Sequence, residues 1–73
     1  MTKDKINIKL IELMIEKKLS KSDLCLLTNI SISTINNYCN NTVKLLDVHV
    51  LCKLCDVLGC NITDLLEYTV MND

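Results

Sequence analysis

Side chains that form hydrogen bonds crowd the stretch SISTINNYCNN, which runs from residue 31 to residue 41. Serine hydroxyls and asparagine amides both donate and accept hydrogen bonds, so they can pair with polar groups such as the edges of nucleic-acid bases. The stretch contains neither arginine nor lysine. Its chemistry is therefore directional hydrogen bonding rather than attraction between charges.

A second cluster joins the single histidine to three of the five cysteines, at His49, Cys52, Cys55 and Cys60. The Cys-x-x-Cys spacing occurs in zinc sites, but on one helix positions 49, 52 and 55 drift by about 60° per three-residue step. Lys53 is the only basic neighbour that could lower a thiol pKa, as a redox switch requires. A metal site and a redox switch are alternatives, but we expect these thiols to pack in the core, with no metal and no cofactor.

Catalytic chemistry finds little support in the remaining residues. His49 is the only histidine, and the chain has no serine, histidine and aspartate in a catalytic order. It also lacks a phosphate-binding loop and a conspicuous pair of carboxylates. We therefore expect a protein that is not an enzyme.

The chain has 73 residues, which suits a single domain spanning residues 1–73, close to the lower limit for a self-sufficient core. Hydrophobic residues make up 49% of it without any Phe or Trp, so the core must be aliphatic. Apolar runs are only a few residues long, far short of the roughly 20 that span a bilayer, and the N-terminus has no signal-peptide core. We expect a cytoplasmic protein without membrane contact, in which the cysteines are free thiols.

Charge is distributed unevenly, although the net charge is only −1. Residues 1–44 contain seven lysines and four acidic residues, whereas residues 45–73 contain one lysine and five acidic residues. If one half faces a polyanion, it is the N-terminal half.

The elements that position these groups are predicted to be helices, because apolar residues recur at helical spacing throughout. A first helix is expected over about residues 6–18. The stripe that it would bury consists of Ile8, Leu10, Ile11, Met14, Ile15 and Leu19. The last few residues of the chain are expected to fray.

Two short helices should follow. Ser20 and Asp23 match a capping box that would start the second helix, and Asn29 would end it in the left-handed conformation. The side chains that this helix would bury are Leu24, Cys25 and either Leu27 or Thr28. Ser31 is the expected N-cap of a third helix that runs to about Cys39, with Ile30 and Ile35 placed as a hydrophobic staple.

Two further helices complete the prediction. Asp47 can cap a fourth helix, and Gly59 lies just beyond its end, where a left-handed residue is needed. Its expected buried stripe is Val48, Leu51, Leu54, Cys55 and Leu58. A capping box from Asn61 to Asp64 would start the fifth helix, which should bury Ile62, Leu65 and Leu66.

The second and third helices, joined by TNIS, form a helix-turn-helix. The stretch LSKSDLCLLTNISISTINNYCNN resembles the XRE, or lambda-repressor-like, family of helix-turn-helix DNA-binding domains. The matching positions are Leu19, Ser20, Leu24, Ile30, Ser31, Thr34, Ile35, Tyr38 and Asn40. The downstream LDVHVLCKLCDVLGCNITDLLEY is similar to the last two helices of that family. The resemblance covers roughly residues 6–68 and implies an all-α, compact five-helix fold.

Several positions depart from the family pattern. Lys21 stands where Gln is frequent, and Cys25 replaces a small Ala. Asn29 and Asn41 replace glycines, and asparagine tolerates the left-handed conformation. Lys18 also stands where the family often has Gly. None of these departures is expected to break the fold.

The resemblance also implies which residues would contact DNA. The base contacts would come from Ile32, Ser33, Asn36 and Asn37, and the phosphate contacts from Lys21, Ser31, Asn40 and Lys44, together with amides at the helix N-terminus. An asparagine can pair with adenine N6 and N7, so this set could read A·T pairs without arginine. Tyr38 is expected to belong to the rim of the core instead.

Two functions follow as hypotheses. The first is a sequence-specific transcriptional regulator of bacterial or phage type, a repressor that binds double-stranded DNA as a homodimer on a two-fold operator. Two linked half-sites would compensate for the weak binding of one domain with so few cations. The alternative is a protein-interaction module, such as an antitoxin or an anti-repressor-like partner. The acidic second half and the absence of arginine favour that alternative.

Overall fold

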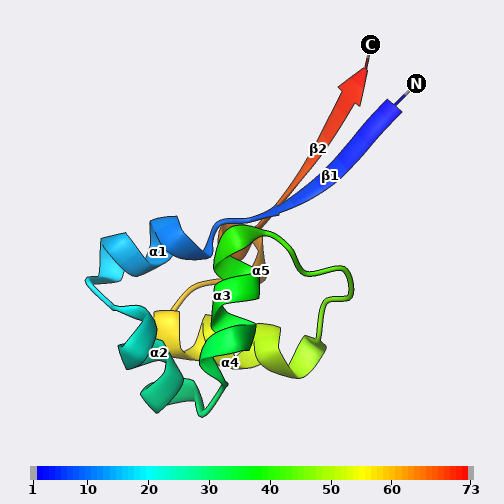
Figure 1. Ribbon diagram of the computed structural model, residues 1–73. Helices are drawn as coiled ribbons and strands as arrows, with labels where there is room; N and C mark the ends of the chain where they lie inside the picture. Colours follow the sequence, from blue (N-terminus) through cyan, green and yellow to red (C-terminus); the bar gives the residue numbers. More distant parts are fainter. Residues whose placement is uncertain (1, 73) are drawn as a thin grey trace.

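The computed structural model describes the backbone of residues 2–72 and the side chains of residues 5–69. Five helices form a globule, and two strands form an arm that projects from it (Figure 1). The elements follow one another as β1 (Thr2–Ile8), α1 (Leu10–Lys17), α2 (Lys21–Thr28), α3 (Ile32–Asn40), α4 (Val48–Leu58), α5 (Ile62–Leu65) and β2 (Leu66–Asn72). The expected five-helix architecture with a helix-turn-helix is confirmed.

The arm is an antiparallel pair of strands that the sequence analysis missed. β1 pairs with β2 from Thr2 opposite Asn72 to Ile8 opposite Leu66. The predictions that a helix begins near residue 6 and that the last residues fray were therefore wrong. Ile6 and Ile8 in β1, and Leu66, Tyr68 and Val70 in β2, do recur at every second position, which is the period of a strand. Each segment is too short to form a sheet alone, and the fold brings together two stretches from opposite ends of the sequence.

Helix α1 begins at Leu10 and buries a different side from the one predicted. Leu10, Leu13 and Met14 are buried, whereas Ile15 is 72% exposed and Ile11 is also exposed. The predicted stripe was thus right for Leu10 and Met14 and wrong for both isoleucines. It assumed that Ile8 belonged to the helix, but Ile8 reaches the core from the end of strand β1.

Helix α2 starts and ends as predicted. The Ser20 hydroxyl accepts from the Asp23 amide at 3.1 Å, and the Asp23 carboxylate accepts from the Ser20 amide at 2.9 Å. Hydrogen bonding of the Asp23 carboxyl to Ser20, first to its backbone amide and then to its side chain, lowers the pKa of that carboxyl. Of the two alternatives for the buried side, Thr28 is buried and Leu27 is 60% exposed. Asn29 then ends the helix with a left-handed φ of 59°.

Helices α4 and α5 have the predicted boundaries at their N-termini. The Asp47 carboxylate accepts from the amides of His49 and Val50 at 2.8 and 3.4 Å, and Gly59 ends α4 with a φ of 62°. The predicted stripes need correction at Val48, which is 72% exposed, and at Ile62, which is also exposed. Val48 and Ile62 stand at the first position of their helices. Leu66 was predicted to be buried by the fifth helix, but α5 ends at Leu65, and Leu66 is a partly buried residue of strand β2.

The core draws large side chains from all five helices. The fully buried ones are Leu10, Leu24, Ile35, Leu54, Leu58 and Leu65. Because every helix contributes, removing one of these side chains would leave a cavity bounded by several elements. In the described part of the chain, none of the helices has the length and apolar character needed to cross a membrane.

Candidate nucleic-acid interface

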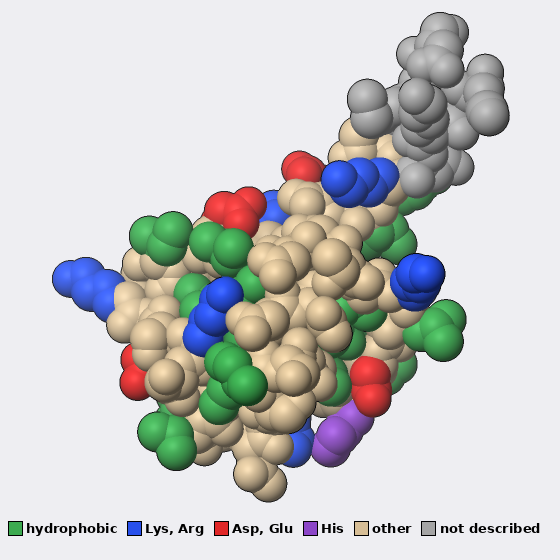
Figure 2. All heavy atoms as spheres, in the orientation of Figure 1, with side chains coloured by type: hydrophobic (Ala, Val, Ile, Leu, Met, Phe, Trp, Pro, Cys, Tyr) green, Lys and Arg blue, Asp and Glu red, His purple; other side chains and the backbone are tan. Residues whose placement is uncertain are grey.

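Helix α3 separates its apolar and polar residues cleanly. Ile35, Tyr38 and Cys39 are buried against the core. Ser33 and Asn37, one turn apart, project from the opposite side and are exposed. The surface over α3, in the middle of Figure 2, is mostly tan, the colour of uncharged polar side chains and backbone, with lysine side chains on several sides.

The N-terminus of α3 is capped by its own side chains. The Ser31 hydroxyl accepts from the Thr34 amide at 3.3 Å and donates to the Thr34 hydroxyl at 3.0 Å. The predicted N-cap is therefore confirmed. The hydroxyl proton of Ser31 is engaged within the helix. A phosphate near this end would therefore accept from the backbone amides of the first turn, and from the Ser31 hydroxyl only when that hydroxyl turns away from Thr34.

The turn between α2 and α3 is held from two sides. The buried Thr28 hydroxyl donates to the Leu24 carbonyl and accepts from the Ile30 amide at 3.2 Å. From α4, the Lys53 ammonium group donates to the Thr28 carbonyl at 3.0 Å. A cation at the C-terminal end of α2 is favourable for the helix dipole as well. The angle between the two helices of the helix-turn-helix is thus fixed by contacts with the rest of the domain.

Asn41 fastens the other end of α3 to the arm. It takes the left-handed conformation with a φ of 58°. Its amide oxygen accepts from the Ile8 amide at 2.6 Å, and its amide nitrogen donates to the Ile8 carbonyl at 3.1 Å. The sequence predicted the backbone conformation of Asn41 but not this contact across 33 residues.

The loop after α3 supports one of the predicted base-reading residues. The Thr42 hydroxyl donates to the side-chain oxygen of Asn37 at 3.1 Å, and the Thr42 amide donates to the Asn37 carbonyl at 3.0 Å. A groove of about 330 Å³ runs along this edge of α3, and Asn37, Thr42 and Lys44 are among its lining residues. Thr42 had no predicted role, because a lone threonine in a loop gives no signal in the sequence.

Tyr38 belongs to the core, as predicted. Its ring is buried, and its hydroxyl accepts from the Asp47 amide at 3.1 Å. This bond ties the end of the loop to α3 immediately before α4 begins. Tyr38 therefore supports α3 from its buried side, and its side chain does not project from the interface.

The predicted contact residues divide into two groups by position. Ser33, Asn37 and Asn40 share the outer side of α3, whereas Asn36 lies on its flank and is only partly exposed, next to Ile32, which is 49% exposed. The predicted phosphate-contacting residues Lys21, Ser31, Asn40 and Lys44 are all exposed, and they lie at the start of α2, at the two ends of α3 and in the loop that follows. An uncharged polar helix between flanking cations suits contact with bases in the groove and phosphates beside it.

The cysteine cluster does not behave as one buried group. Cys52 is exposed, so the prediction that it packs in the core was wrong, while Cys55 and Cys60 are partly buried against the core. The three thiols share an apolar groove of about 480 Å³. Burial and the neighbouring Cys60 and Cys52 raise the pKa of Cys55. Among the described side chains, no three from His, Cys, Asp and Glu are placed to hold a metal ion.

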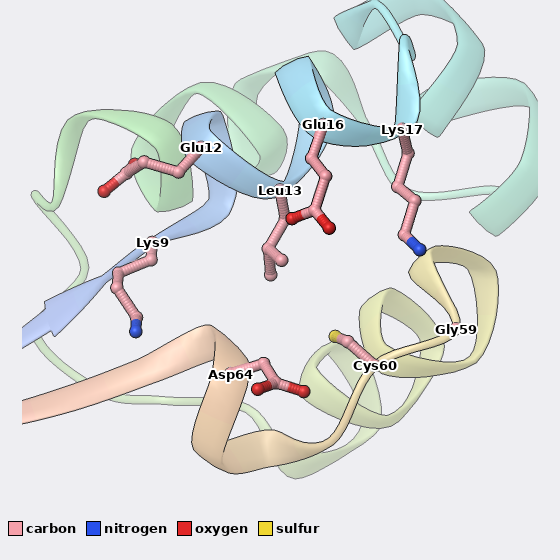
Figure 3. Close-up of a pocket in the computed structure, with 8 residues that line it drawn as sticks. All are labelled: Lys9, Glu12, Leu13, Glu16, Lys17, Gly59, Cys60 and Asp64. Carbon is pink, nitrogen blue, oxygen red and sulfur yellow. The ribbon is translucent and has the colours of Figure 1, made fainter.

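A hollow of about 350 Å³ lies between α1 and the start of α5 (Figure 3). Three carboxylates and two ammonium groups line it, together with the Cys60 thiol. Glu16 and Asp64 approach it from opposite sides, and Lys9 and Lys17 lie near its ends. Opposite charges are mixed around this space, so it does not favour an anion such as a phosphate over a cation.

Comparisons with known proteins agree with this geometry. The sequence model of the Cro/C1-type HTH DNA-binding domain matches residues 9–70. Among solved structures, a crystal structure of the transcriptional regulator VanUg is similar, with a TM-score of 0.75 and 25% sequence identity, over 93% of this chain and 89% of that chain. No curated protein sequence matches the chain. The predicted resemblance to helix-turn-helix DNA-binding domains is thus confirmed.

Proposed function

Because the chain belongs to the family of Cro/C1-type helix-turn-helix DNA-binding domains, we propose that it is a sequence-specific transcriptional repressor. It binds double-stranded DNA as a homodimer on a two-fold operator. The similarity to a structure described as a transcriptional regulator supports the regulatory part of this proposal. We propose no enzymatic activity and no cofactor, and we place the protein in the cytoplasm, where the DNA of a bacterium or a phage lies.

The observation that carries the proposal is the outer side of α3. Ser33, Asn37 and Asn40 are exposed on α3, where the Lys53 contact with Thr28 holds the turn before the helix and the Asn41 contact with Ile8 holds its C-terminal end. A helix held in this way can enter the major groove in one orientation. Side chains that project from it then meet base edges at fixed positions, which is the condition for reading sequence.

We assign base contacts to Ile32, Ser33, Asn36 and Asn37. Asn37 is the strongest of these, because it is exposed on the outer side and its side-chain oxygen accepts a hydrogen bond from the Thr42 hydroxyl. Asn36 contacts a base from the flank of the helix, and Ile32 can pack on a thymine methyl group. Phosphate contacts are assigned to Lys21, Ser31, Asn40 and Lys44, the exposed residues around the ends of the two helices.

Dimerisation follows from the small number of cations. Lys21 is the only lysine between residues 20 and 41, and each neutralised phosphate contributes about 0.9 to the salt slope of binding. One domain with two lysines at its interface would therefore hold DNA weakly. Two copies on adjacent half-sites convert the second contact into an intramolecular one and raise the affinity without new contacts.

The test is a selection from duplex DNA with a randomised centre, followed by fluorescence anisotropy with the enriched duplex. We expect a two-fold symmetric consensus and sedimentation of the complex as two protein chains per duplex. If no duplex is enriched over the starting pool at low salt, the DNA-binding proposal fails. The interaction-module alternative would then take its place, with the exposed Val48 and Ile62 beside the α4–α5 groove as the first candidates for its contact surface.

A further inference from the structure

We infer that strand β2 carries the dimer interface, and that its open edge pairs antiparallel with the same edge of a second copy of the chain. The result is a four-stranded sheet in the order β1–β2–β2–β1, with the two-fold axis at its centre. The inference rests on the proposed function, because it names the surface through which the proposed homodimer forms. It gives a partner to the arm, which leaves the globule (Figure 1).

The arm has little support from the rest of the domain. At its root Ile8 is buried and Leu66 is partly buried, but beyond that point the two strands project away from the helices (Figure 1). Within the described residues, the sheet consists of β1 and β2 alone. A two-stranded sheet is marginally stable at best in water, and a third strand or a packed helix is needed to stabilise it. An added strand would supply that support.

The arm also exposes an apolar pair. Ile6 lies opposite Tyr68 in the β1–β2 ladder, so their side chains share one face of the sheet. Ile6 is 50% exposed and Tyr68 is 63% exposed. The face continues at the root into a groove of about 260 Å³, whose lining includes Ile6, Ile8, Val43 and Leu46. A strand added beside β2 would cover the flank of Tyr68.

The two edges of the arm differ in charge. Each strand of a two-stranded sheet leaves one row of backbone N–H and C=O groups without a strand partner. In β1 three consecutive residues are charged, Lys3, Asp4 and Lys5, and charged residues, lysine above all, protect an edge from pairing. In β2 the only charged residue is Glu67. The β2 edge is therefore the one that is open to another strand.

A second copy suits this edge because β2 is complementary to itself. A two-fold axis at Thr69, the middle residue of β2, overlaps all seven residues of both strands. In this register Glu67 lies opposite residue 71 of the second copy, a methionine, so the two glutamates do not face each other. The β1 strands become the outer edges, where their charges oppose further pairing. The contact thus closes at two chains.

Cysteine cross-linking tests the register. Directly opposite residues of antiparallel strands have Cα atoms about 4.5–5.5 Å apart, within the range of a disulfide. Thr69→Cys, treated with oxidised glutathione, should therefore give a covalent dimer on a non-reducing gel, well above the background from the five native cysteines of the wild type. The matched control is Lys5→Cys, because Lys5 is exposed and lies opposite Thr69 within the arm. In the four-stranded sheet its two copies are three strand spacings apart, about 14 Å, and should not cross-link.

Charge substitution tests whether this contact holds the dimer together. Thr69→Glu should preserve the arm, because Lys5 lies opposite residue 69 within it. Across the two-fold axis, however, the variant places two carboxylates directly opposite each other. Sedimentation equilibrium without DNA should show a dimer for the wild type and several-fold weaker dimerisation for Thr69→Glu. An equal mixture of Thr69→Glu and Thr69→Lys chains should recover the dimer, which a merely unstable arm would not do.

Three results would overturn the inference. These are a Thr69→Cys yield no higher than the wild-type background, cross-linking of Lys5→Cys to the same extent, and no recovery in the mixture. If Thr69→Glu still binds the enriched duplex as two chains with wild-type affinity, dimerisation uses another surface, and the inference fails while the proposed function stands. Conversely, cross-linking and sedimentation need no DNA, so a selection that enriches no duplex would refute the proposed function and leave the β2 contact intact. A wild type that is monomeric both alone and on DNA would refute the inference and the proposed homodimer together.

Discussion

Replacing Asn41 with glycine should destabilise the protein, although the family pattern has glycine at this position. Glycine adopts the left-handed conformation at no steric cost, so the backbone at residue 41 would lose nothing. The substitution removes two hydrogen bonds to the Ile8 backbone, at 2.6 and 3.1 Å. At about 0.5–1.5 kcal/mol for each bond, the free energy of unfolding should fall by about 1–3 kcal/mol.

The control is Asn29→Gly. Asn29 has nearly the same conformation, with a φ of 59° against 58° for Asn41, but it is exposed and none of the hydrogen bonds found involves its side chain. Its replacement by glycine should therefore change the stability by no more than about 0.5 kcal/mol. Urea unfolding followed by circular dichroism measures both variants. If Asn41→Gly is as stable as the wild type, the contact with Ile8 contributes nothing and the reasoning about the arm is refuted.

Three further predictions concern the core, the DNA contacts and the effect of pH. Leu54→Ala should lower the free energy of unfolding by about 2–5 kcal/mol, because it leaves a cavity at a fully buried position. Leu26→Ala, at an 84% exposed position, should change it by less than about 0.5 kcal/mol. Equal unfolding midpoints of the two variants in urea would contradict the assigned core. Lys21→Ala should reduce the slope of log affinity against log salt by about one unit on specific and random duplexes alike, and Lys17→Ala, on α1, should leave it unchanged. The pKa of Asp23 is lower in the folded than in the unfolded protein, so the stability that it contributes is present above the ordinary aspartate pKa near 4 and is lost as the pH falls below it. Asp23→Asn should make the unfolding midpoint less sensitive to pH in that acidic range, and an unaltered pH profile would show that the capping box is not coupled to ionisation.

Local signals made most of the helical fold predictable. Ser20, Ser31 and Asp47 cap their helices through hydrogen bonds between their own side chains and backbone amides two or three residues further along the chain. The same is true of the left-handed Asn29 and Gly59. In each case the interacting groups are neighbours in the chain, so the sequence alone contains the relevant contact.

Long-range contacts account for what the sequence did not reveal. The arm depends on pairing between residues 2–8 and 66–72, and neither segment has a turn nearby that would mark a hairpin. The wrong prediction of which side of α1 is buried follows from the missed strand β1, because a helix that begins at Leu10 does not include Ile8. Similar reasoning applies to Asn41, whose partner lies 33 positions earlier in the chain.

In the candidate interface, too, some features follow from local sequence signals and others depend on contacts that only the fold creates. The exposure of Ser33 and Asn37 follows from helical periodicity once Ile35 and Tyr38 are assigned to the core. What periodicity cannot supply is the orientation of a side chain within its surroundings. The support of Asn37 by Thr42 depends on how the chain turns after α3, and that turn is visible only in the structure.

The bond between Asn41 and Ile8 also has a mechanical consequence. It joins the last turn of α3 to the root of the arm, where the amide of Lys9 donates to the Leu65 carbonyl at 2.7 Å. Tilting the arm must therefore break these bonds or carry α3 with it. The arm is thus mechanically coupled to α3. If α3 contacts DNA as proposed, a molecule that binds the arm in one tilt would alter the affinity of α3 for DNA. By reciprocity, DNA seated on α3 would alter the grip on the arm by the same factor.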